Sequence, residues 1–112
     1  METTRQNKVS RLIQKDLSEF FRKESRTYFH GALITVTKVK VTKDVGIARI
    51  YLSLFGAPDK LALMKYIEEN TKHIRHQMAT RIKMQIRFIP ELEFYEDDSM
   101  EYLENIERLL KK

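Results

Sequence analysis

The first part of the chain follows the hydrophobic spacing of one helical face. Its apolar side chains recur at steps of one, three and four residues, at Val9, Leu12, Ile13, Leu17, Phe20 and Phe21. This pattern predicts an amphipathic helix over residues 4–23. Thr4 or Asn7 is expected to cap it, because a short polar side chain at that position accepts a hydrogen bond from the first exposed amides.

Two stretches with the alternating pattern of β-strands come next. Residues 33–41 are rich in β-branched side chains, which favour a pleated strand. Their alternation changes phase between Val36 and Val39, so we expect a β-bulge there, or burial on both faces at the start of the strand. A second strand is expected over residues 45–55. The turn over residues 42–44 is so short that the two strands must form an antiparallel hairpin.

A long helical pattern with one interruption occupies the middle of the chain. Asp59 is the expected N-cap, and apolar residues then recur at helical steps as far as residue 82. The polar run 69–71 breaks the pattern, which predicts a kink or two consecutive helices. A third strand is expected over residues 85–89. It should stop at Pro90, because proline has no N–H to donate within a ladder.

The chain ends with an extended segment and one more amphipathic helix. Asp98 and Glu101 have the spacing of a capping pair at the start of that helix. The element order is therefore α-β-β-α-β-α with a kinked middle helix, which indicates an α+β domain with one sheet covered by helices. With 112 residues and no linker or repeat, the chain can bury one core, so we expect a single domain over residues 1–112.

Composition and spacing argue against an active site. The chain has no Cys, which excludes disulfides, Cys-ligated zinc and thiol nucleophiles, and its three isolated glycines form no phosphate-binding loop. His73 and His76 are three residues apart, but Lys72 and Arg75 flank them and would oppose a bound dication. The acidic run 96–98 is typical of a solvated turn with one capping member. We expect no enzyme activity, no metal, no cofactor and no small-molecule substrate.

The sequence also indicates where the protein acts. No stretch approaches 18 consecutive apolar residues, and the first residues include no apolar signal segment. The absence of cysteine suits a reducing compartment. We therefore expect a cytoplasmic protein with no membrane contact, monomeric when free because no long heptad pattern is present.

The formal net charge of +5 conceals a marked asymmetry. Residues 1–90 carry 18 Lys and Arg against 8 Asp and Glu, whereas residues 91–112 carry 3 against 8. A basic body of this size is typical of proteins with a nucleic-acid partner. Residues 72–87 contain no carboxylate, so their cations are suited to binding backbone phosphates. The alternative interpretation is that these cations only solvate a helix face.

The expected RNA-binding residues are cations of the first helix and of the segment 72–87, since phosphate contacts position a protein on RNA without reading its sequence. They are Arg5, Lys8, Arg11, Lys15, Lys72, Arg75, His76, Arg81, Lys83 and Arg87. Tyr51 lies on the polar phase of its strand, where it either stacks on a base or packs at the edge of the core.

Several segments, in the same order along the chain, resemble the bacterial ribosome-binding factor A family. The most specific ones are the hairpin residues Ile34, Thr35, Val36, Thr37 and Val39 and the stretch Ile89, Pro90, Glu91, Leu92 and Phe94. Residues 5–17, 48–53, 73–75 and 98–101 add to the resemblance. The family has Ala-x-Gly at the junction of its middle helices, whereas this chain has Asn70, Thr71 and Lys72, of which asparagine best tolerates left-handed backbone angles.

This resemblance implies a type II KH-like domain, with the order αββααβ, a C-terminal helix and a three-stranded sheet covered by helices. It also implies a protein that binds the small (30S) ribosomal subunit and its rRNA and assists late maturation and processing of that rRNA, without being an enzyme.

Two functions are open on the sequence alone. The leading hypothesis is a ribosome-assembly factor that docks on rRNA through its basic residues and acts by binding and release. The alternative is a protein-interaction module whose acidic C-terminal segment (residues 91–107) docks on a basic ribosomal protein or regulator. A hydrolase or nuclease is disfavoured, because no catalytic constellation is present.

Overall fold

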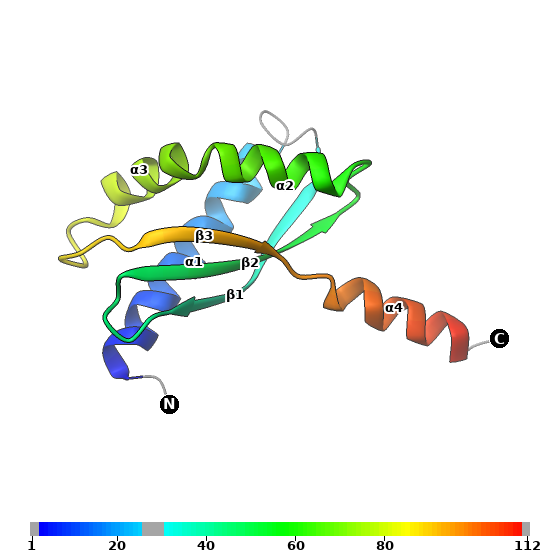
Figure 1. Cartoon of the computed structure of the whole chain (residues 1–112), viewed down its shortest axis with the longest axis horizontal. Helices are drawn as coiled ribbons and strands as arrows, with labels where there is room; N and C mark the ends of the chain where they lie inside the picture. The colour runs from blue at the N-terminus through cyan, green and yellow to red at the C-terminus, as the bar shows by residue number, and fades with distance from the viewer. Residues whose placement is uncertain (1–2, 26–30, 111–112) are drawn as a thin grey trace.

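The structure, a computed structural model, describes residues 3–25 and 31–110, without the side chains of residues 100–105. Its elements are α1 (Thr4–Glu24), β1 (Leu33–Val41), β2 (Ile47–Phe55), α2 (Lys60–Glu69), α3 (Thr71–Ile82), β3 (Glu91–Glu96) and α4 (Ser99–Leu110) (Figure 1). This α+β order, αββααβ followed by a C-terminal helix, is that of the type II KH-like domain which the resemblance implied.

The three strands form one mixed sheet in the order β1-β2-β3. β1 and β2 are antiparallel, and their register shifts between Val36 and Lys38, so the predicted hairpin and its bulge are both confirmed. β2 and β3 are parallel, with Ile47 opposite Glu91. Parallel neighbours need a long crossover connection, which α2 and α3 provide.

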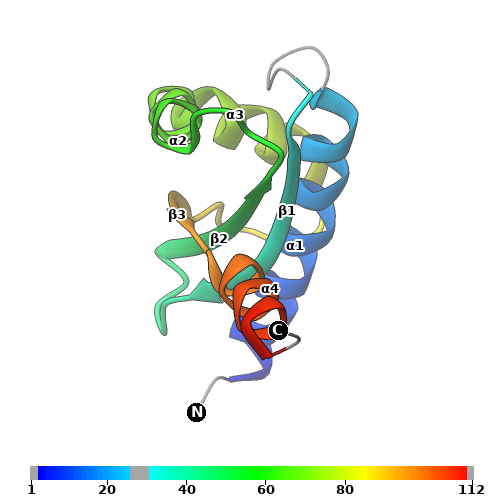
Figure 2. The ribbon, with the colours of Figure 1, turned by 90° about the vertical axis from the view of Figure 1, so that its right-hand side faces the viewer.

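The helices of the body cover one face of this sheet. On β2 the side chains of Ala48, Ile50, Leu52 and Leu54 are buried. Arg49 and Tyr51 alternate with them and lie on the opposite face, away from the core. α1 packs along β1, while α2 and α3 pack against β3 (Figure 2). α4 extends away from the end of the sheet, so the first three helices provide the helical layer over the core.

The apolar stripe predicted for the first helix is the face that α1 buries. Ile13, Leu17 and Phe21 have no exposed surface. The Phe21 ring meets Phe20 and Phe94 edge to face, with centroids 5.2 and 6.0 Å away. Phe21 therefore joins α1 to β3 across the core.

The start of α1 differs from the prediction. Its N-cap is Thr3, not Thr4 or Asn7. The Gln6 amide N–H donates to Thr3 Oγ1 (3.1 Å), and the Thr3 N–H donates to Gln6 Oε1 (2.8 Å). This reciprocal capping box satisfies two amide groups at once, which no single cap at Thr4 or Asn7 would do.

The other two caps have separate outcomes. The cap at Asp59 is confirmed, because its Oδ1 accepts from the Ala62 N–H (3.0 Å) at the start of α2. The expected pair of Asp98 and Glu101 stays a prediction, since the side chain of Glu101 lies outside the described residues.

The expected strand over residues 85–89 is wrong. β3 begins after Pro90, at Glu91, whose N–H donates to the carbonyl of Gly46 (2.9 Å). Because Pro90 has no N–H, the ladder begins after it instead of ending before it. The carbonyls of Ile89 and Pro90 bind a side chain from α3 in place of a neighbouring strand. Residues 83–90 are therefore a connection from α3 to β3, which we call the basic loop.

The predicted interruption of the middle helix is confirmed, because Asn70 alone separates α2 from α3. Its backbone angles, φ −99° and ψ 9°, are not left-handed. The Asn70 Nδ2 group donates to the Tyr66 carbonyl (2.8 Å), and Thr71 Oγ1 donates to the Ile67 carbonyl (3.2 Å). Polar side chains therefore satisfy the last carbonyls of α2, a task that a left-handed glycine often performs at a helix end.

A single carboxylate, Asp97, joins the β3–α4 connection to the bulge of β1. It accepts hydrogen bonds from the Ser99 amide (3.0 Å) and from Thr37 Oγ1 (2.6 Å). The hydrogen bonds from Ser99 and Thr37 hold the pKa of Asp97 below its ordinary value. Its stabilising contribution is thus fully present above the unfolded-state pKa of about 3.9 and is lost as the pH falls through the lower folded-state pKa.

We expect Asp97→Asn to be less stable than the parent at about pH 6 and to approach it at about pH 2.5, where both side chains are uncharged. Urea unfolding at the two pH values measures this difference. Glu96→Gln, at an exposed neighbouring carboxylate, is the control. A stability gap for Asp97→Asn that does not change with pH would contradict the role given to this carboxylate.

Candidate nucleic-acid interface

The exposed face of α1 carries four of the predicted cations. Burial of the apolar stripe directs the opposite side of the helix to solvent. All four side chains are exposed there, at Arg5, Lys8, Arg11 and Lys15. Within the described part of the chain, none of these four has a carboxylate partner in an ion pair, so their charges face solvent.

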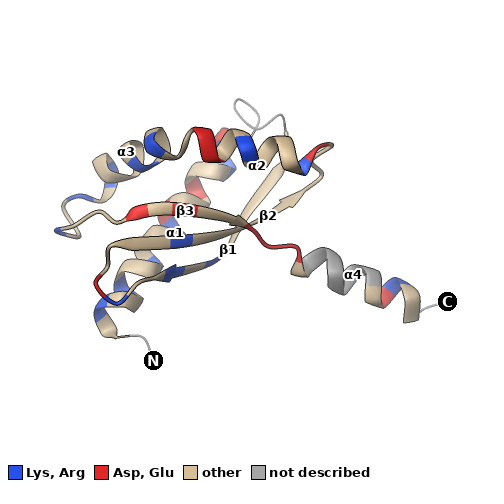
Figure 3. Ribbon diagram, viewed as in Figure 1, with Lys and Arg blue, Asp and Glu red and all other residues tan. Residues whose placement is uncertain are grey.

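A groove of about 350 Å³ lies where α1 meets the basic loop and the β1–β2 turn. Arg5 and Lys8 line it from α1, Arg87 and Phe88 line it from the basic loop, and Val45 lines it from the turn. None of the described residues that line it is Asp or Glu. The fold thus brings cations from the two ends of the basic body together at one end of the molecule (Figure 3).

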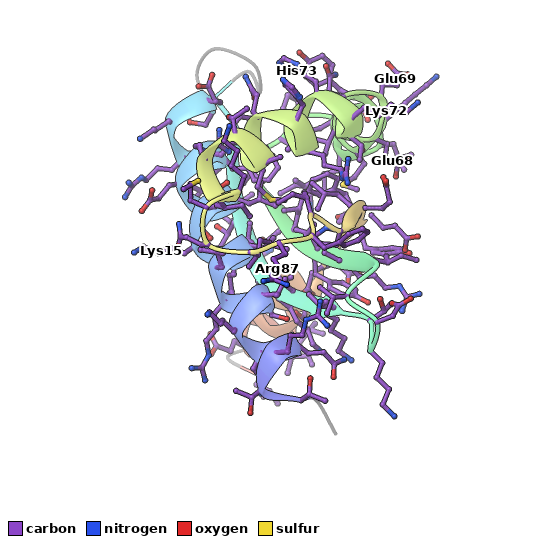
Figure 4. The ribbon with its side chains drawn as sticks, turned by 90° about the vertical axis from the view of Figure 1, so that its left-hand side faces the viewer. Lys15, Glu68, Glu69, Lys72, His73 and Arg87 are labelled. Carbon is purple, nitrogen blue, oxygen red and sulfur yellow. The ribbon has the colours of Figure 1, made fainter. Side chains whose placement is uncertain are left out.

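The remaining exposed cations lie around this groove and along α3. Lys83 is exposed at the start of the basic loop, and Lys72 and His76 are exposed on α3. Figure 4 places Lys72 near Glu68 and Glu69, at the junction of α2 and α3, and places Arg87 on the part of this face nearer α1. The charge at the junction is therefore mixed, whereas the groove is cationic.

Arg75 forms hydrogen bonds within the protein. Its Nη2 donates to the Ile89 carbonyl (2.6 Å), and its Nε donates to the Pro90 carbonyl (2.9 Å). Its Nη2 is also 3.7 Å from Glu91 Oε1. These contacts hold the end of the basic loop on α3, so Arg75 positions this surface and has few donors left for a phosphate.

Arg81 also has partners inside the protein. Its Nε and Nη2 donate to the two carboxylate oxygens of Asp16 on α1 (2.9 and 2.8 Å). Its guanidinium carbon is 5.5 Å from the centroid of the Phe20 ring. Hydrogen bonding to Asp16 raises the pKa of Arg81 above its ordinary value. Glu19 and Glu24 line the hollow beside this pair, so the sequence's acid-free segment does not form an unbroken basic surface.

We expect Arg75→Ala to lower the free energy of unfolding by about 2 kcal/mol, because it leaves two main-chain carbonyls without their charged donor. Arg87→Ala removes the same side chain type from the exposed basic loop and should change stability by less than about 0.5 kcal/mol. Urea unfolding of the two variants provides the comparison. Equal effects of the two substitutions would show that Arg75 does not hold the loop.

Two exposed apolar residues of the basic loop were not singled out from the sequence. The exposed fractions of Met84 and Phe88 are 90% and 55%. The sequence analysis assigned residues 85–89 to a strand, which gave Phe88 no separate meaning. The signal that would have found it is an aromatic residue directly after Arg87 in a segment without carboxylates.

Tyr51 packs on the open face of the sheet against its cross-strand neighbour. Its ring stacks on that of Tyr95 with centroids 5.4 Å apart, and Lys38 Nζ is 6.0 Å from the Tyr51 centroid. The Tyr95 hydroxyl donates to Glu93 (2.7 Å), which raises the pKa of Tyr95. A neighbouring ring thus covers one face of Tyr51, in agreement with its interpretation as a packing residue.

Two further searches of the described residues gave no candidates. Among them, no three His, Asp or Glu side chains come together as metal ligands. No helix in the described ranges is both long and apolar enough to cross a bilayer.

Comparisons with known proteins agree on one family. The family model described as ribosome-binding factor A matches residues 5–110. The ribosome-binding factor A of Cytophaga hutchinsonii is 41% identical over 112 residues, which are 100% of this chain and 84% of that protein. The protein of the same name from Prosthecochloris aestuarii is 48% identical over 109 residues, which are 96% of this chain and 88% of that one.

Solved structures show the same fold. The crystal structure of ribosome-binding factor A from Thermus thermophilus matches with a TM-score of 0.66 at 19% identity, over 81% of this chain and 94% of that one. Coordinates of the Thermus thermophilus factor, fitted into a cryo-EM map of a 30S complex, match with a TM-score of 0.51 at 19% identity, over 73% and 96% of the two chains.

Proposed function

The chain belongs to the ribosome-binding factor A family, and from this premise we propose that it binds the small (30S) ribosomal subunit through rRNA and assists late maturation and processing of that rRNA. A Thermus thermophilus relative has been placed in a 30S complex, which supports the choice of partner. The protein acts in the cytoplasm as a single-domain monomer, by binding and release without catalysis.

The observation that carries this proposal is the groove with three cations and no carboxylate among its described lining residues. Cations that neutralise phosphates release condensed counterions, and this release supplies affinity that falls steeply with salt. The rigid sheet and helices fix the spacing of these cations, so they favour one arrangement of the phosphates over others. Such a surface can hold an immature rRNA conformation without forming or breaking a covalent bond.

The rRNA-binding surface extends outward from the groove. Its exposed cations are Arg5, Lys8, Arg11, Lys15, Lys72, His76, Lys83 and Arg87. Arg75 and Arg81 belong to it as positioning residues, because their guanidinium groups already bind Ile89, Pro90 and Asp16. Phosphates that reach these two arginines would contact the outer edge of groups already held in place.

Cosedimentation with small subunits tests the proposal. The protein is expected to migrate with immature small subunits at about 50 mM salt and to dissociate from them at about 500 mM. Depletion of the protein is expected to leave small-subunit rRNA with unprocessed ends. No comigration, or comigration that does not change with salt, would contradict rRNA binding through phosphates.

One observation favours a second candidate function. α4 extends from the body and exposes Leu109 and Leu110, with exposed fractions of 69% and 79%. A helix of this kind is suited to docking on another protein. In that case Leu109→Ser combined with Leu110→Ser abolishes subunit binding, whereas binding through rRNA phosphates leaves it unchanged.

A further inference from the structure

We propose that the groove between α1, the β1–β2 turn and the basic loop binds one nucleotide of single-stranded RNA, with the base stacked on Phe88 and the phosphate held by Arg5, Lys8 and Arg87. This inference rests on the proposed function and deepens it. It adds a contact to a base, and it places that contact at a defined site in the fold.

The size and charge of the groove suit this occupant. A volume of about 350 Å³ lies within the range of pockets that hold small organic molecules. Arg5 and Lys8 approach from one side and Arg87 from the other, with no Asp or Glu among the described residues of the lining. A phosphate in this position would be surrounded by donors from two separate elements, and nothing described in the lining would repel it.

Phe88 provides an apolar surface beside these cations. Its ring is 55% exposed, although a phenyl group gains free energy when it leaves water. Aromatic rings next to basic side chains are the recurring platform for unpaired bases, because every base has a π-face. A base within a duplex has both faces covered by its neighbours, so a single-stranded segment is the form of RNA that fits.

The walls of the groove are fixed before any ligand binds. Val45 has a φ of 61°, a left-handed conformation that is a genuine outlier for a β-branched residue. Its N–H donates to the Thr42 carbonyl (2.8 Å), and Asp44 accepts from the Gly46 N–H (2.9 Å) and from Thr42 Oγ1 (2.8 Å). The strained turn is thus held by its own hydrogen bonds. On the opposite side, Arg75 holds the end of the basic loop.

The absence of Trp from the chain makes this site accessible to fluorescence. Phe88→Trp places a single fluorophore in the groove, and stacking on a base is expected to quench its emission when a six-nucleotide single-stranded RNA is added. Met84→Trp is the matched control, since Met84 is 90% exposed in the same loop but does not line the groove. It should be quenched weakly, as should Phe88→Trp with an RNA of the same length that lacks bases.

A loss of affinity provides the second readout. Phe88→Ser is expected to weaken binding of the hexanucleotide about tenfold without changing the slope of affinity against salt, whereas Phe88→Tyr retains binding. Arg87→Gln should reduce that slope by about 0.7, the value for one phosphate contact with a single strand. Urea unfolding of each variant shows whether the fold is retained.

The outcomes separate this inference from the function on which it rests. If the parent protein comigrates with small subunits but Phe88→Ser binds the hexanucleotide as the parent does, or Phe88→Trp and Met84→Trp are quenched equally, the groove does not bind a base. The same conclusion follows if the parent does not bind the hexanucleotide at all. If the parent fails to comigrate with small subunits, the proposed function is wrong, whatever the hexanucleotide shows.

Discussion

Reversal of three charges around the groove, by Lys8→Glu, Lys83→Glu and Arg87→Glu in one variant, is expected to weaken binding to small ribosomal subunits about 100-fold at low salt. Each of these side chains is exposed, and no ion pair in the described part of the chain holds any of them. The substitutions therefore remove phosphate contacts without breaking an internal one. The slope of the logarithm of affinity against the logarithm of salt concentration should fall by about 3.

A second triple variant controls for net charge. Lys38→Glu, Lys40→Glu and Lys65→Glu change the charge by the same amount at positions on β1 and α2, away from the groove. This control should bind subunits nearly as well as the parent does at physiological salt, where charges beyond about 8 Å are screened. Equal losses of affinity in the two variants would show that net charge, and not the groove, determines binding.

Phe21→Ala is expected to lower the free energy of unfolding by about 4 kcal/mol. Its side chain has no exposed surface and contacts Phe20 and Phe94 edge to face, so truncation leaves a cavity between α1 and β3. The loss loosens the packing of α1 on the sheet, which sets the position of Arg5 and Lys8 at the groove. Urea unfolding measures the change directly.

Phe55→Ala is the matched control for Phe21→Ala. Phe55 is 54% exposed at the end of β2, and its truncation should cost much less, about 0.5 kcal/mol. If the two substitutions were equally destabilising, the described core would be wrong.

Much of the fold could be predicted from the sequence, because local patterns determine local structure. The apolar stripe of α1, the hairpin with its change of phase after Val36, and the break at Asn70 each result from interactions over a few residues. The position of β3 could not be predicted in this way. Residues 85–89 and the segment after Pro90 both have extended character, and the hydrogen bonds of Arg75 to Ile89 and Pro90 decide between them only after the chain has folded.

The candidate site was only partly visible for the same reason. Charge along the chain pointed to α1 and to residues 72–87, and the fold joins Arg5, Lys8 and Arg87 at one groove. It could not separate free cations from bound ones, because the partner of Arg81 is Asp16, 65 residues away. The exposure of Phe88 likewise depends on the loop that replaces the expected strand.

Photocrosslinking of the protein to rRNA in the assembled complex with small subunits, followed by mass spectrometry of its peptides, tests the central claim most directly. The account predicts crosslinks to rRNA in peptides of α1 and of the basic loop, with Phe88 among the modified residues. Crosslinks to rRNA confined to α4, or crosslinks only to ribosomal proteins, would contradict it.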